Sequence, residues 1–125
     1  AMPVWPIEPI EDHPSVTLRS WAAFEVPLHG HDQPWTRHLA GYSCEDRQGQ
    51  VCSPVQSFDP ATGQCVTRSG RVYLLQGRPG LDQDSEYVWR RWKRIADITQ
   101  ERDVTQEVFE AVCAAKSGAG RGVAD

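Results

Sequence analysis

The sequence lacks the patterns by which many functional classes are recognised. No apolar run approaches the roughly 18–20 residues that a membrane-spanning helix needs, and no basic stretch precedes an apolar one as in a signal peptide. It contains neither the G-x-S-x-G motif of many hydrolases nor a glycine-rich phosphate-binding loop. These absences lead us to expect a cytoplasmic protein that is not an enzyme.

Closely spaced cysteine pairs are also absent. Zinc modules and redox sites place cysteines at short spacings such as C-x-x-C, which the four cysteines of this chain do not form. The pattern therefore favours free thiols, several of them buried as small apolar side chains. A disulfide and a metal site are the alternatives. The cysteines are Cys44, Cys52, Cys65 and Cys113.

An excess of basic residues is missing as well. The chain has 13 Lys and Arg residues and 17 Asp and Glu residues, which gives a net charge of −4 at pH 7. Nucleic-acid binding requires a positive field over the contact surface, so this composition argues against a general nucleic-acid binder, although a local basic patch remains open. With 125 residues and 39% hydrophobic content, the chain can form one domain without disulfides or metals.

Alternating apolar and polar residues predict β-strands along the first two thirds of the chain. Turn-forming segments rich in glycine, proline and aspartate separate them, and Pro54 indicates an edge or a bulge in the third strand. The predicted strands are residues 16–28, 36–44, 51–58, 64–68 and 71–76. We expect an antiparallel sheet of about five strands, built from hairpins and a meander.

Helical periodicity begins after residue 80. Val88, Trp92 and Ile95 recur at i, i+4 and i+7, which predicts a helix over residues 84–98 that buries these three side chains, with Trp89 at the border. A second helix is predicted over 104–116, with a strand over 104–109 as the alternative. The fold class is α+β, with the sheet packed against one or two C-terminal helices.

The ends of the chain differ in composition from this core. Proline recurs every third residue in the first ten positions, which predicts a proline-rich arm over residues 1–14. The last nine residues contain alternating glycines, which predicts a flexible tail over 117–125. A single α+β domain is expected between them, over residues 15–116.

The first predicted helix carries a cluster of cations, Arg90, Arg91, Lys93 and Arg94. Such a row can recognise phosphate or an acidic protein surface, because guanidinium groups pair with both in a bidentate manner. It can equally be structural, since cations late in a helix complement its negative end and cover aromatic rings. A strand precedes this helix where a helix-turn-helix protein would have a helix, which argues against sequence-specific DNA reading.

Two further polar sets are candidates. His29, His31 and His38 flank the first predicted hairpin loop, where Asp32 or Cys44 could add a metal ligand. A solvated turn explains this set better, so we predict neither a metal nor another cofactor. The second set could mimic phosphates toward a basic partner and consists of Glu45, Asp46, Asp82, Asp84 and Glu86.

Three segments of the chain resemble a pattern in short uncharacterised proteins of proteobacterial prophages and integrative mobile elements. The segments are residues 57–62, 67–74 and 77–80, and the similarity continues through residues 86–89, Trp92 and residues 103–105. These proteins have no assigned activity, so no functional residue carries over, and Cys44, Cys52 and Cys65 lie outside the pattern. The resemblance implies a setting in which small acidic proteins often modulate host defence, for example as inhibitors of CRISPR or restriction complexes.

We therefore predict a non-catalytic protein-binding module, with a host-defence or other nucleic-acid-processing complex as the expected partner. One alternative is a nucleic-acid-binding protein that uses the basic helix over residues 87–95. Another is a small metal-binding protein or enzyme that uses the histidine loop. The sequence leaves the oligomeric state open, a homodimer included.

Overall fold

The computed structural model describes residues 14–124, and the side chains of residues 14–116. The predicted proline-rich arm therefore lies, apart from Pro14, outside the described residues. The elements in chain order are β1 (Ser15–Val26), β2 (Thr36–Ser43), β3 (Gln48–Val51), β4 (Val55–Asp59), β5 (Gln64–Thr67), β6 (Val72–Leu75), α1 (Gln83–Ile95), β7 (Arg102–Asp103) and α2 (Thr105–Ala124).

The strands form one mixed sheet, which confirms the predicted α+β class. Their order is β3-β2-β1-β6-β5-β4, with β7 beside β1, so the sheet has seven strands where about five were predicted. The pairing of β1 with β6 is parallel, which corrects the prediction of a purely antiparallel sheet. These two strands lie far apart in the sequence. No turn joins them, so no local signal sets their relative direction.

A bulge divides β1 into two halves with different neighbours. The register against β2 shifts between Arg19 and Ala22, and Ser20 has a φ of 48°. The first half of the strand pairs with β6, and the second half pairs with β7. The extra residue exchanges the two faces of the strand, so Trp21 joins the core beside Leu18 and is 1% exposed.

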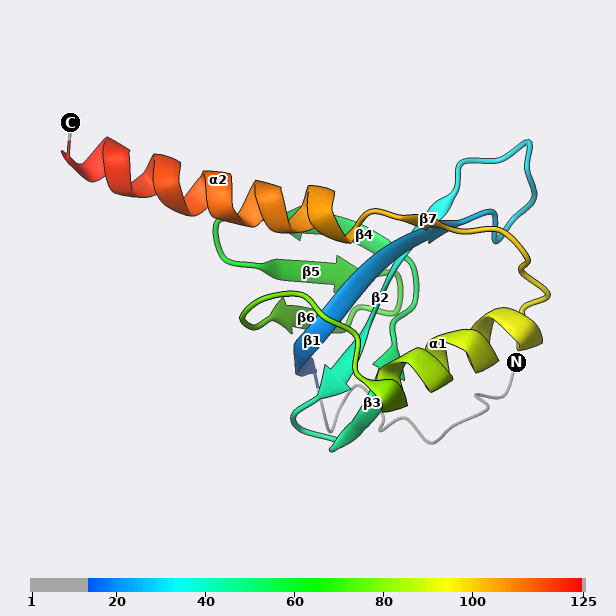
Figure 1. The fold of residues 1–125 in the computed structure, drawn as a ribbon. Helices are drawn as coiled ribbons and strands as arrows, with labels where there is room; N and C mark the ends of the chain where they lie inside the picture. Colours follow the sequence, from blue (N-terminus) through cyan, green and yellow to red (C-terminus); the bar gives the residue numbers. More distant parts are fainter. Residues whose placement is uncertain (1–13, 125) are drawn as a thin grey trace.

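The two helices lie on opposite sides of β1 (Figure 1). On one side α2 contributes Val108 and Phe109 to the core that contains Trp21, whose ring meets that of Phe109 edge to face at 6.5 Å. On the other side α1 covers a second core, in which Trp89 stacks on Phe24 at 4.6 Å. The second half of β1 is therefore buried on both faces.

Pro54 interrupts the predicted third strand. The structure has β3 before it and β4 after it, where one strand over residues 51–58 was predicted. The Cys52 N–H still donates a hydrogen bond to the Leu39 carbonyl oxygen of β2 at 3.0 Å. The Pro54 carbonyl oxygen instead accepts one from the Arg68 N–H, just after β5, at 2.8 Å. Since proline has no N–H to continue the first ladder, the chain leaves one partner strand and joins another at this point.

The helix α1 is rotated about its axis relative to the prediction. Its buried residues are Ser85 and Trp89, whereas Ile95, predicted to be buried, is 53% exposed. Gly49 on β3 explains this orientation, because a Cβ at that position would lie 2.9 Å from both the Asp84 carbonyl oxygen and the Ser85 Cα. The bare glycine backbone lets the start of the helix touch the strand, which turns Ser85 and Trp89, one turn later, toward the sheet.

Both helices begin at aspartates. Asp82 caps α1 by accepting a hydrogen bond from the Ser85 N–H at 2.8 Å, and Asp103 accepts from the Thr105 N–H at 2.9 Å before α2. The strand alternative for residues 104–109 is therefore wrong. Where the prediction ended the second helix at residue 116, α2 continues to Ala124 without a proline to interrupt it. Neither helix in the described part of the chain has the length and apolar character needed to cross a membrane.

Candidate binding surface

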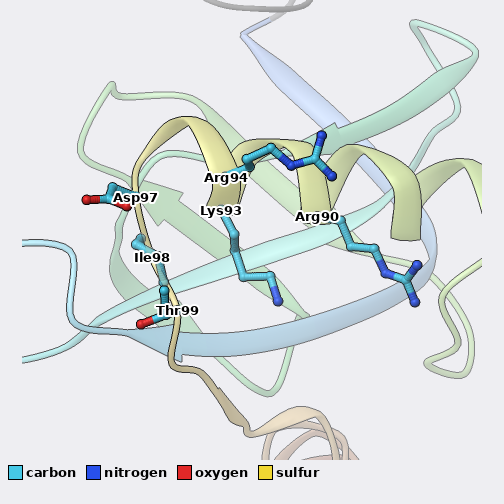
Figure 2. Close-up of a pocket in the computed structure, with 6 residues that line it drawn as sticks. All are labelled: Arg90, Lys93, Arg94, Asp97, Ile98 and Thr99. Atoms are coloured by element: carbon cyan, nitrogen blue, oxygen red, sulfur yellow. The ribbon is translucent and has the colours of Figure 1, made fainter.

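The four cations of α1 fall on two different sides of the helix. On one side, Arg90 forms an ion pair with Glu86 one turn earlier, and Lys93 pairs with Glu101 in the loop after the helix. Figure 2 shows Arg90 and Lys93 extending to the same side, whereas Arg94 points away from both. The predicted basic row is therefore not one continuous surface.

Lys93 belongs to the packing around Trp89. Its ammonium lies 5.7 Å from the centre of the Trp89 ring, and the indole Nε1–H donates to the same Glu101 that binds the ammonium, at 3.2 Å. Trp89 in turn stacks on Trp92 with ring centres 5.1 Å apart. Lys93 and Glu101 thus cover the edge of the aromatic core. For Lys93, this is the structural role that the sequence pattern allows as the alternative to ligand recognition.

The cavity beside this side of α1 has a volume of about 470 Å³. Arg90, Lys93 and Arg94 line it together with Asp97 (Figure 2). Two of these cations are already paired, and the third, Arg94, points away from them. A phosphate would therefore gain little there.

A different stripe of α1 is chemically mixed, and it is exposed except at the half-buried Arg91. Its four residues recur at i, i+4, i+7 and i+8, so they share one face, which we call the outer stripe: Tyr87, Arg91, Arg94 and Ile95. Tyr87 is 62% exposed and Ile95 53% exposed, and they are the exposed large apolar side chains of the described residues. An Arg91 Nη1–H donates to the Tyr87 hydroxyl at 3.4 Å. Within residues 14–116, neither arginine of the stripe has a carboxylate partner.

Most of the predicted acidic set acts inside the molecule. Glu45 accepts hydrogen bonds from the backbone N–H and the hydroxyl of a threonine on β1, at 2.7 and 2.9 Å. Asp46 accepts from a serine hydroxyl of β2 at 3.2 Å, Asp82 caps α1, and Glu86 binds an arginine one turn later. Asp84 lies exposed in the first turn of α1, where its charge complements the positive helix end. These roles explain the set without phosphate mimicry.

The predicted histidine loop does not bring its histidines together. His38 is buried in the core, the exposed His29 lies 3.5 Å from an arginine of the β5–β6 turn, and the exposed His31 contacts the ring of Trp35 at 6.1 Å. Among the residues that the structure describes, no group of three or more His, Cys, Asp or Glu could hold a metal ion. The metal-binding alternative therefore finds no support in this geometry.

His38 is a neutral core residue. Its Nδ1 lies 2.9 Å from the Cys52 carbonyl oxygen, and because a carbonyl can only accept, Nδ1 carries the proton. Its Nε2 accepts from the Thr36 hydroxyl at 2.8 Å, and the ring packs on Trp92 at 4.6 Å. Burial lowers the pKa of His38 from 6.5 to about 4. A histidine held in this way has no lone pair left for a metal or for base catalysis.

The four cysteines are free, and two of them lie in the core. Burial raises the pKa of Cys52 and that of Cys65 to about 12 in each case. The Cys52 sulfur also accepts a hydrogen bond from the Leu39 N–H at 3.1 Å. Since the thiolate is the nucleophilic form, neither thiol is suited to nucleophilic catalysis.

These positions predict which thiols react in the folded protein. Iodoacetamide at pH 8 is expected to modify the exposed Cys113 within minutes, whereas Cys52 and Cys65 react only after unfolding in guanidinium chloride. Mass spectrometry of the digested protein measures both outcomes. Rapid native labelling of Cys52 or Cys65 would contradict the burial of these two thiols in the core.

Comparisons with models of protein families, with curated proteins and with solved structures find no match. The resemblance to proteins of mobile elements therefore stays a prediction. The residues that sequence reasoning missed are Tyr87 and Ile95. Their spacing places them on one helical face with Arg91 and Arg94, which could have identified the stripe. The prediction that Ile95 is buried prevented this.

Proposed function

We propose that this chain is a non-catalytic protein-binding module that uses the outer stripe of α1 to bind an acidic, partly apolar surface of another protein. The observation that carries the proposal is the coincidence on one stripe of Tyr87 and Ile95, both more than half exposed, with two arginines that lack carboxylate partners among the described residues. Tyrosine and arginine dominate the energetics of protein interfaces.

The stripe is well suited to recognition because the helix that carries it is rigid. Trp89, on the opposite side of the helix, is 2% exposed and stacks between Phe24 and Trp92. The helix is thereby fixed to the sheet, so its backbone presents the stripe in one arrangement, whereas the Arg91–Tyr87 hydrogen bond, at 3.4 Å, restrains the two side chains only weakly. Binding would therefore require little additional ordering of the backbone, which favours affinity.

The chemistry of the stripe defines its partner. Guanidinium groups form bidentate pairs with carboxylates, so Arg91 and Arg94 would contact Asp or Glu side chains. Tyr87 and Ile95 would enter an apolar depression between or beside those carboxylates. The non-catalytic part of the proposal is supported by the buried, protonated state of Cys52 and by the neutral His38 in the core.

Charge reversal on the stripe tests the proposal. Tagged protein captures its partner from a proteobacterial host lysate, the setting that the resemblance implies, and the affinity for the purified partner is then measured by calorimetry. The double variant Arg91→Glu/Arg94→Glu is expected to weaken binding at least tenfold, because truncating or reversing a buried charge pair costs about 2–5 kcal/mol.

The matched control is Arg78→Glu, which reverses an exposed arginine in the loop before α1 and should leave the affinity unchanged. Equal affinity of the double variant and the parent protein for a specifically captured partner would exclude the outer stripe as the binding surface.

Nucleic-acid binding is the second candidate, favoured by the two arginines of the stripe, which have no carboxylate partner within residues 14–116. Two phosphate contacts would give a logarithmic salt dependence with a slope of about −2 on double-stranded DNA. A gel shift at low salt that disappears in Arg91→Glu/Arg94→Glu would replace the protein-binding proposal with this one. We expect no shift on DNA or RNA, because the net charge is −4 and the neighbouring cations are already paired.

A further inference from the structure

A second cleft lies between the β1–β2 loop and the start of β4. Its volume is about 400 Å³, and its walls come from His29, residues 33–37, residues 54–56 and Arg68. None of these residues belongs to α1, so the cleft is separate from the outer stripe. Clefts that hold small ligands have volumes of about 300–1,000 Å³, which places this one within the usual range.

The charge of the cleft is one-sided. Its described lining includes His29, Arg37 and Arg68 but no carboxylate, in a chain with more acidic than basic residues. Arg37 is already held by Glu25 at 2.9 Å and by Glu107 at 3.0 Å.

Arg68 has no such partner. Among the described residues its guanidinium contacts only the His29 Nε2, at a long 3.5 Å. A single hydrogen bond of this length satisfies little of the capacity of five N–H donors. An anion that enters the cleft would accept much stronger, charge-assisted hydrogen bonds from Arg68.

A rigid apolar wall lies beside this charge. Trp35 lines the cleft together with Pro34 and Pro54. The Arg102 guanidinium covers the Trp35 ring at 4.3 Å, and Arg102 is itself paired with Glu25 at 3.5 Å. The tryptophan is thus held in place by Arg102, and together with the two proline rings it gives the cleft an apolar surface against which a flat group can lie.

We propose that this cleft binds a small organic anion, in which a phosphate or carboxylate group is carried on a flat apolar body. Arg68 binds the anionic group, with the His29 ring beside it, and the flat body lies against Trp35 and the prolines. The site is independent of the proposed protein-binding surface.

Matched pairs of charged and neutral probes test the proposal. The first pair is AMP and adenosine, and the second is benzoate and benzamide. NMR titration of the full chain follows the His29 ring and the Trp35 indole N–H. At least one anion is expected to shift both signals in a saturable manner with a Kd of about 1 mM or tighter, and its neutral counterpart at least tenfold more weakly. The pair that responds identifies the anionic group as phosphate or carboxylate.

Two arginine variants supply the control. Arg68→Gln is expected to weaken anion binding at least tenfold, whereas Arg91→Gln, the same change on the outer stripe, leaves it unchanged. The opposite result is expected for the protein partner, so each of the two proposals can fail alone. The anion site is overturned by the absence of saturable shifts up to about 10 mM of either anion, by equal binding of a neutral probe, or by unchanged binding to Arg68→Gln.

Discussion

Trp89→Ala is expected to lower the free energy of unfolding by roughly 3–5 kcal/mol, a large part of the stability of a domain of this size. The Trp89 side chain is 2% exposed and stacks between Phe24 and Trp92, with ring centres at 4.6 and 5.1 Å. Its removal leaves a cavity between α1 and the sheet. It also leaves Glu101 without the indole donor, which lies at 3.2 Å.

Guanidinium chloride denaturation measures this loss, and the matched control is Ile95→Ala. Because Ile95 is 53% exposed, its truncation should change the free energy of unfolding by less than about 1 kcal/mol. The helical periodicity of the sequence predicts the reverse order, with Ile95 buried and Trp89 at the border. A larger loss for Ile95→Ala than for Trp89→Ala would contradict an α1 that turns Trp89 toward the sheet.

Acidification is expected to destabilise the fold through His38. The pKa of this ring is about 4 in the folded protein and 6.5 as the reference for the unfolded chain, so the unfolded chain binds more protons between these values. Stability therefore falls as the pH falls from about 6.5 to about 4. The contribution of this buried group to the loss is about 3 kcal/mol. Above pH 6.5 the contribution is fully present.

Urea denaturation at a series of pH values measures this dependence, and His38→Gln should flatten it between pH 6.5 and 4. Val112→Ala provides the control, since it destabilises the buried face of α2 without changing His38, and should keep the slope of the parent protein. An unchanged slope in His38→Gln would contradict a neutral, buried His38. NMR titration of the His38 ring in the folded parent protein checks the pKa directly.

The local elements could be predicted because their signals are local. Alternation located β1, β2, β5 and β6, and the turn at residues 59–63 depends on residue types with fixed backbone preferences. The bulge at Ser20 could not be predicted in this way. Serine has no special preference for the φ of 48° that Ser20 adopts. The bulge becomes evident only from the shift in register of β1 against β2.

The arrangement of the elements depends on contacts between distant residues. The parallel pairing of β1 with β6 and the contact of Gly49 with the start of α1 both join segments far apart in the chain. The second contact fixes the rotation of α1, and with it the division of the basic row. Sequence reasoning correctly selected Arg91 and Arg94 as surface cations. It could not know that Glu101 would bind Lys93, or that Tyr87 and Ile95 would be exposed beside the two remaining arginines.

The central claim is that the outer stripe of α1 contacts another protein, and site-specific photo-crosslinking tests it most directly. A photoreactive phenylalanine derivative at position 87 is compared with the same group at the exposed loop position 78, in proteobacterial cells, the setting that the sequence resemblance implies. Position 87 is expected to form a discrete covalent adduct, which disappears when Arg91→Glu and Arg94→Glu are added. Position 78 is expected to form no adduct. An adduct at position 78 with none at position 87, or an adduct at 87 that survives charge reversal, would contradict the claim.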